Sequence, residues 1–144
     1  MKTVFAPILA LALVSSCAKA VPKGAVSVAD IIDNIHAWDG ETVTVHGWLG
    51  QCQKLSCVLY ASLSDAIIVE SQRPDQAKLS AAIEGVSIGS SKTFDEAAAQ
   101  LQFSEVIIRG KVSDECRGLF VDCTDRGPDL YPISIASYSS ERAN

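Results

Sequence analysis

The chain has 144 residues and a formal net charge of −5 at pH 7, from 17 acidic and 12 basic side chains. This length is typical of one domain with a single hydrophobic core. An acidic surface repels the phosphates of nucleic acids and anionic lipid headgroups, so the composition argues against nucleic acid as a partner and against membrane binding through the protein surface.

The N-terminal residues have the pattern of an export signal. Lys2 precedes an apolar run from Val4 to Val14, which is too short to span a bilayer. Small residues follow the run, and Ala18-Lys19-Ala20 could serve as the cleavage site of an ordinary secretory signal.

The residues Val14-Ser15-Ser16-Cys17 resemble the lipobox of bacterial lipoproteins. The resemblance implies that residues 1–16 are a signal peptide and that Cys17 carries acyl chains such as palmitate on its sulfur and its new N-terminus. Several acyl chains are enough for stable membrane anchoring. The residue after the lipidated cysteine influences sorting between the membranes. Because this residue is Ala18 and not an Asp, the same resemblance implies the outer membrane, facing the periplasm.

The N-terminal part of the mature chain is expected to be a tether followed by a helix. Residues 17–26 have no amphipathic period and predict a lipidated tether before a domain of residues 27–144. Ser27 is expected to cap the first helix, and Asp30 places a negative charge in its first turn. The apolar stripe of this helix consists of Ile31, Ile32 and Ile35.

Two long strands are predicted from strict alternation of apolar and polar residues over residues 41–50 and 104–113. Each contains an inward-facing glycine. Gly47 predicts a bend or bulge in the first strand, and in both strands the glycine, Gly47 or Gly110, stands where the strand would curve most sharply around a small barrel. The inward faces hold Val43, Val45 and Leu49 in the first strand and Val106, Ile108 and Val112 in the second. The other face of the second strand holds Glu105, Ile107, Arg109 and Lys111.

The remaining elements are shorter. Strands are predicted over residues 57–62 and 66–70, joined at Ser64-Asp65, and a last strand over 131–137 with Ile133 and Ile135 facing inward. Helices are predicted over residues 75–84 and, with Thr93 and Glu96 as a capping box, from Thr93 to about Leu101. Residues 86–92 are predicted to form a loop.

This order of elements resembles an OB-fold. The residues Ser27-x-x-Asp30-Ile31 and Asp39-Gly40-x-x-Val43-x-Val45-x-Gly47 resemble the entry to small exported bacterial OB-type domains. The resemblance implies a mainly β fold, a small five-stranded OB-like barrel with an N-terminal helix and a helical connection between strands three and four. The connection over 71–103 and the loop over 114–130 are longer than this pattern requires.

Four cysteines remain when Cys17 is set aside, namely Cys52, Cys57, Cys116 and Cys123. An even number in an exported chain predicts disulfides. We favour local pairing, Cys52–Cys57 and Cys116–Cys123, because each pair sits at the mouth of a short connection. The two crossed pairings stay open, as does a zinc site, although these spacings are wider than those of the usual zinc motifs. No Cys-x-x-Cys redox motif occurs.

Candidate binding residues lie on the outward face of the first strand. Thr44, His46 and Trp48 alternate there, and with Tyr60 they could stack on and hydrogen-bond to a sugar ring or a peptide side chain. The structural alternative is that Trp48 covers the fold and His46 is an ordinary surface residue. The acidic residues Asp122, Asp125 and Asp129 indicate a solvated loop, since they lack calcium-binding spacing.

The sequence contains no glycine-rich phosphate loop. We therefore expect no cofactor and no enzymatic activity, but a lipid-anchored cell-envelope binding module whose partner is a protein or a glycan. The alternative is a metal-binding or redox protein using the four cysteines. A hydrolase would require Ser or Asp side chains to meet His46 in space.

Overall fold

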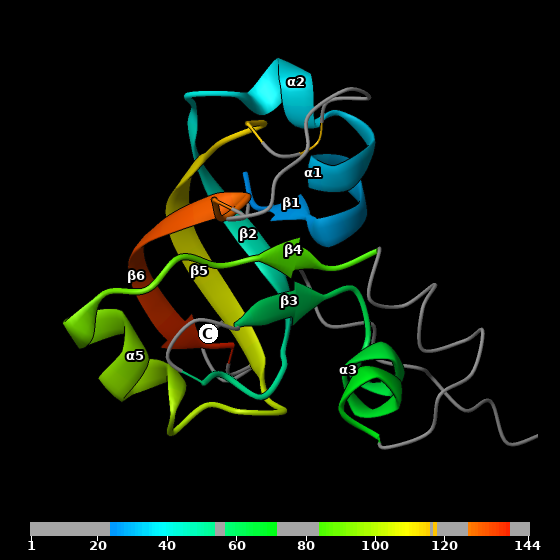
Figure 1. Cartoon of the computed structure of the whole chain (residues 1–144), viewed down its shortest axis with the longest axis vertical. Helices are drawn as coiled ribbons and strands as arrows, with labels where there is room; N and C mark the ends of the chain where they lie inside the picture. The colour runs from blue at the N-terminus through cyan, green and yellow to red at the C-terminus, as the bar shows by residue number, and fades with distance from the viewer. Residues whose placement is uncertain (1–23, 54–56, 72–83, 116, 118–126, 139–144) are drawn as a thin grey trace, which may run out of the picture.

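The computed structural model describes residues 24–53, 57–71, 84–115, 117 and 127–138. This part of the chain forms a mainly antiparallel sheet of six strands with a few short helices (Figure 1). The mainly β prediction is therefore confirmed. The elements are β1 (Val26–Ser27), α1 (Val28–Asp33), α2 (Ile35–Trp38), β2 (Thr42–Leu49), β3 (Val58–Tyr60), α3 (Leu63–Glu70), β4 (Val86–Ser87), α5 (Lys92–Ala98), β5 (Glu105–Val112) and β6 (Leu130–Ser137).

The strand order is β4-β3-β2-β5-β6, and β1 pairs in parallel with β2. β2 pairs with β5 along nearly its whole length, from Thr42 to Trp48. Within the described residues the two edges of the sheet meet through one isolated parallel bridge, between Ile88 and Leu130. The Gly89 N–H donates to the Leu130 carbonyl there at 2.8 Å. The sheet is strongly curved, but its strand pairing does not close it into a complete barrel.

Ser27 caps the first helix, as predicted. The Asp30 N–H donates to the Ser27 hydroxyl oxygen at 3.0 Å, and the Ser27 N–H donates to the Asp30 carboxylate at 3.1 Å. These reciprocal bonds satisfy two backbone donors that the first turn leaves without helical partners. Asn34 separates α1 from α2, so the predicted single helix consists of two short ones. Val26 already pairs with β2, which places it in the sheet and not in the tether.

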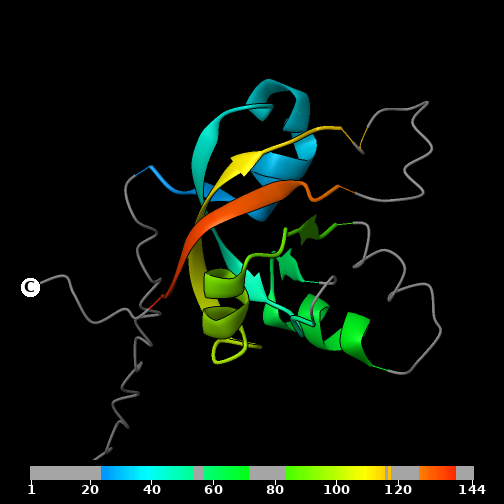
Figure 2. The same cartoon turned by 60° about the vertical axis from the view of Figure 1, so that its left-hand side comes forward.

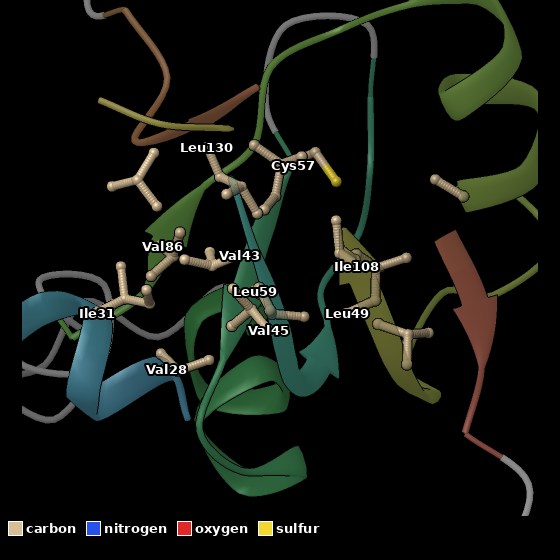
Figure 3. Packing of buried hydrophobic residues seen from close by; sticks show 14 of the residues in the cluster. Val28, Ile31, Val43, Val45, Leu49, Cys57, Leu59, Val86, Ile108 and Leu130 are labelled. Atoms are coloured by element: carbon tan, nitrogen blue, oxygen red, sulfur yellow. The ribbon is translucent and has the colours of Figure 1, made fainter. Parts of the chain in front are cut away.

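The core lies on the inward face of β2 and β5, where the predicted alternation is confirmed. Val45, Leu49, Val106 and Ile108 are each 0% exposed, and burial of such a side chain contributes roughly 1.5–3 kcal/mol. Figure 3 shows these strands meeting α1 around the core. α1 and α2 lie at one end of the curved sheet, and α3 and α5 lie at the other (Figures 1 and 2). Helix residues in the core cluster are Val28, Ile31, Ile35, Phe94 and Ala98.

The two strand glycines allow close approach of neighbouring chains. A Cβ at Gly47 would lie 2.8 Å from the Tyr60 carbonyl oxygen, and one at Gly110 would lie 2.7 Å from the Tyr131 carbonyl oxygen. Both distances are too short for a side chain, so a residue without Cβ is required. The pairing of β5 with β6 shifts register between Arg109 and Gly110, but the extra residue of this bulge lies in β6 and not in β5.

The predicted strand over residues 66–70 is wrong, because this segment belongs to helix α3. Ser62 is its N-cap: the Asp65 N–H donates to the Ser62 hydroxyl oxygen at 3.1 Å, and that hydroxyl donates to the Asp65 carboxylate at 2.6 Å. The pair Ser64-Asp65, interpreted as a turn, lies in the first turn of this helix. The apolar run that follows fits both a buried strand and a helix, and the cap decides for the helix.

The next helical segment also differs in detail from the prediction. The N-cap of α5 is Ser91, whose hydroxyl oxygen accepts from the Phe94 N–H at 3.3 Å, so Thr93 lies inside the helix and does not cap it. Residues 86–87, predicted as loop, form the short strand β4. Most of the helix predicted over residues 75–84 lies outside the described residues.

Ile133 does not face inward as predicted, since it is 57% exposed, whereas Ile135 is partly buried. The cause is the register shift in β6. Arg109 pairs with Ser134 and Gly110 pairs with Pro132, which leaves Ile133 as the extra residue of a bulge. The extra residue reverses the alternation, and a proline within a sheet favours such an irregularity because it cannot donate a ladder hydrogen bond.

Candidate functional site

β2, β5 and β6 lie side by side and present one face away from the core (Figures 1 and 2). Directly paired residues in an antiparallel sheet point to the same side, so the register places the outward side chains in rows across the three strands. We call this surface the outer face. Its rows are Thr42–Lys111–Tyr131, Thr44–Arg109–Ser134 and His46–Ile107–Ala136, and Trp48 pairs with Glu105 beyond them.

A polar cluster occupies one end of the outer face. The Nε2 atom of His46 lies 2.9 Å from a carboxylate oxygen of Glu105, and both side chains are largely buried, at 18% and 13% exposure. The Tyr138 ring packs edge-on against the His46 ring, with centroids 4.7 Å apart. A carboxylate oxygen can only accept, so Nε2 of His46 donates to Glu105 in this contact. The arrangement orients His46 for hydrogen bonding.

Thr44 and Trp48 lie on the same face of β2 as His46, which places the three together as the sequence analysis expected. All three side chains are partly buried. Trp48 is therefore neither fully buried nor fully exposed. Thr44 pairs with Arg109 of β5, so a hydroxyl and a guanidinium group stand in one row.

Tyr60 does not lie on the accessible part of this surface. It pairs with Trp48, but its side chain is only 2% exposed. Burial, followed by the charge of Glu70, raises the pKa of Tyr60 to about 12. Cβ atoms at Gly50 and Gly85 would lie 2.7 Å and 3.1 Å from carbons of its ring, so the two glycines make room for it. The expectation that Tyr60 contributes to an exposed binding surface is corrected accordingly.

The first cysteine loop is closed by a disulfide between Cys52 and Cys57, which confirms local pairing for this pair. Cys57 is buried in the core, and the bond joins the end of β2 to the start of β3. In this state neither sulfur is a thiolate, the form that binds zinc. Cys17, Cys116 and Cys123 lie outside the described residues.

Asp129 is buried, with 5% exposure, and is not part of a solvated acidic loop as predicted. Arg117 donates from Nε and Nη2 to the two carboxylate oxygens, at 3.0 and 2.8 Å. Ser87 of β4 adds its N–H and its hydroxyl to the same carboxylate, at 2.8 and 2.9 Å. The hydrogen bond to Asp129 also raises the pKa of Arg117. We call these residues the arginine lock, because they fix the segment before β6 to β4.

A separate contact ties the residues that follow β5 to α2. His36 Nδ1 lies 2.6 Å from a carboxylate oxygen of Asp114, and the Asp114 N–H donates to the Asp39 carboxylate at 3.2 Å. The His36 side chain is 67% exposed, so water screens this ion pair. The contact holds the chain that follows β5 next to α2.

In the described part of the chain, no three His, Cys, Asp or Glu side chains are arranged to hold a metal ion. Nor does any helix here combine the length and the apolar character that a membrane crossing requires.

Arg109, Lys111, Tyr131 and Glu105 were not singled out by sequence reasoning as site residues. Alternation placed the β5 residues on the outward side, which was the available signal. The position of Tyr131 beside Lys111 depends on the register of β6, which no local pattern specifies.

No protein-family model and no curated protein sequence matches this chain. Among solved structures, the chain is similar to OBody AM3L09 bound to hen egg-white lysozyme, at 20% sequence identity and a TM-score of 0.44. The similarity covers 82% of this chain and 97% of that one. A likeness of this extent carries no argument about function.

Proposed function

We propose that this protein is a lipid-anchored binding module of the bacterial cell envelope, with Cys17 as the lipidated residue, and that the outer face of β2, β5 and β6 is its binding surface. The partner is an envelope protein or glycan. The anchor rests on the lipobox pattern Val14-Ser15-Ser16-Cys17. Ala18 after the lipidated cysteine, by resemblance to lipoprotein sorting signals, favours the outer membrane, with the domain facing the periplasm.

An OB-type architecture is part of this proposal. In the path β4-β3-β2-β5-β6, the five strands after β1 have the chain order 3-2-1-4-5. Closing a barrel from this path requires strands three and five to pair, and the bridge between Ile88 and Leu130 lies between the segments that would do so. α5 lies in the connection between strands three and four, where an OB-fold has its helix.

The observation that carries the binding proposal is the presence of two large exposed apolar side chains on the outer face. Tyr131 is 45% exposed and Ile133 is 57% exposed. They share the face with His46 and Trp48. Exposed apolar groups gathered beside polar ones are typical of protein interaction surfaces, and Tyr and Trp are common anchors in them.

Site-specific photo-crosslinking in the native cells tests the binding surface. A benzophenone amino acid replaces Ala136, an exposed residue of the outer face, and separately Ala37, an exposed residue of α2. We expect a covalent adduct from position 136 and none from position 37. Trp48→Ala should reduce the yield of the adduct several-fold. The variant should still unfold in a cooperative thermal transition with a measurable midpoint, which shows that it is folded. Equal adducts from both positions, or none from position 136, would contradict the proposal.

The anchor and the cysteine chemistry are tested by the intact mass of protein extracted from its own membranes, alkylated with and without prior reduction. Acyl mass on Cys17 and four thiols that react only after reduction are expected. Thiols that react without reduction would instead favour the metal-binding or redox alternative for Cys52, Cys57, Cys116 and Cys123.

A further inference from the structure

Two cations stand side by side on the outer face. Arg109 and Lys111 occupy alternate positions of β5, so they point to the same side, and both are exposed. Within the described part of the chain, neither forms an ion pair. They stand on a chain whose formal net charge is −5, which makes this pair a local exception to the overall charge.

Hydroxyl groups flank the two cations on both neighbouring strands. Lys111 lies between Thr42 and Tyr131, and Arg109 lies between Thr44 and Ser134. The rows therefore combine cationic donors with neutral hydroxyls that can donate to the same oxygen atoms. A carboxylate accepts up to about four hydrogen bonds, so it matches such a row of donors.

Two apolar side chains complete the arrangement. Tyr131 lies in the Lys111 row, and the β6 bulge places Ile133 on the exposed side between the two rows. We call Arg109, Lys111, Tyr131 and Ile133 the cationic strip. The bulge lets Ile133 share the exposed side with Tyr131 while Ile135 faces inward.

We propose that the cationic strip binds an extended acidic segment of a partner protein, with carboxylates on Arg109 and Lys111 and apolar side chains against Tyr131 and Ile133. This inference rests on the proposed function and specifies its partner. Alternate residues of a strand are roughly 7 Å apart, and an extended peptide repeats its same-side side chains at the same spacing. Two acidic residues separated by one position therefore match the two cations.

The range of the charges favours a short acidic segment over a long polyanion. Exposed charges act over a Debye length of about 8–10 Å at ordinary ionic strength. A short segment on β5 meets mainly the two cations, whereas nucleic acid extending beyond the strip meets a protein of net charge −5. On the same face of β5, the carboxylate of Glu105 is already hydrogen-bonded to His46, which reduces its repulsion of an acidic ligand.

The test places the benzophenone amino acid at Ser134, an exposed residue in the Arg109 row, in the full chain in its native cells. The adduct is compared between the otherwise wild-type chain and the variant R109Q/K111Q. The control is K92E at the exposed start of α5, which changes the net charge by the same amount, and a negative charge in a first helical turn is well tolerated. Mass spectrometry identifies the crosslinked segment.

We expect an adduct with a protein segment containing Asp or Glu at alternate positions. R109Q/K111Q should reduce its yield about fivefold, as for the loss of two exposed ion pairs, and K92E should leave it unchanged. An adduct insensitive to R109Q/K111Q, or one with a glycan, a lipid or a segment without acidic residues, would overturn the inference. If one of these contrary results is found at position 134 but position 136 still gives an adduct, the proposed function stands and only the acidic-segment inference fails. If neither position reacts, both fail.

Discussion

At the scale of single residues, Tyr60 shows how burial converts an apparent ligand-binding side chain into a structural one. Its pKa is raised from 10.0 to about 12, first by burial and then by Glu70. The folded state therefore retains the phenolic proton in a range where the unfolded chain has lost it. Below pH 10 both states are protonated and this group contributes no pH dependence.

Between pH 10 and 12 the unfolded chain binds fewer protons than the folded one, so the free energy of unfolding should fall as pH rises. Tyr60→Phe removes the titrating group, and its urea midpoint should fall less steeply than that of the wild type across this window. Tyr131→Phe, at a tyrosine that is 45% exposed, is the matched control and should keep the wild-type slope. Identical slopes for the wild type and Tyr60→Phe would show that Tyr60 titrates alike in both states.

At the scale of elements, the arginine lock holds the segment before β6 against β4. Asp129→Asn keeps the size of the side chain but leaves the partly buried Arg117 without its counter-charge. Leaving a buried charge uncompensated is strongly destabilising, and we expect a loss of about 3 kcal/mol in urea unfolding at pH 7.

A double-mutant cycle separates the lock from general disruption. Arg117→Met removes the charge that needs compensation, so adding Asp129→Asn to it should cost much less than Asp129→Asn costs alone. Additive losses would mean that the two groups are not energetically coupled, despite their 2.8 Å contact.

The long strands could be predicted from sequence, whereas the shorter elements could not. β2 and β5 each carry an unbroken alternation, and burial of one face enforces it. The apolar run in α3 is compatible with either a strand or a helix, and the N-cap at Ser62 favours the helix. The exposure of Ile133 depends on a register shift between β5 and β6, which is a tertiary property.

The same distinction applies to the candidate site. Thr44, His46 and Trp48 share a face because a strand has a period of two residues, so their grouping could be predicted. The bond from His46 to Glu105 joins residues 59 positions apart and requires the register between two strands. β3 has three residues, too few for alternation to indicate which way Tyr60 points.

At the scale of the whole molecule, charge and anchoring have complementary parts in the proposal. An acidic domain, from a chain of formal net charge −5, gains nothing from anionic headgroups, so the lipid on Cys17 would supply the membrane affinity. The cationic strip then remains available for a partner. Because exposed ion pairs are screened by salt, adduct formation at Ser134 should weaken as ionic strength rises.

The disulfide acts on the whole chain because it restricts the unfolded state. Cys52 and Cys57 are 5 positions apart, and closing so short a ring contributes about 2 kcal/mol in the chain-entropy model. Cys52→Ala/Cys57→Ala should therefore lower the unfolding midpoint by roughly 8 °C in calorimetry, with the fold retained. If Cys116 and Cys123 form the second local pair, reduction of the wild type should lower the unfolding midpoint further. Reduction of the variant Cys116→Ala/Cys123→Ala should lower it only by the amount that loss of the Cys52–Cys57 bond causes. If reduction of the wild type costs no more than the Cys52 and Cys57 replacements, a second crosslink is excluded, and those two cysteines become the free thiols on which a metal-binding or redox function would depend.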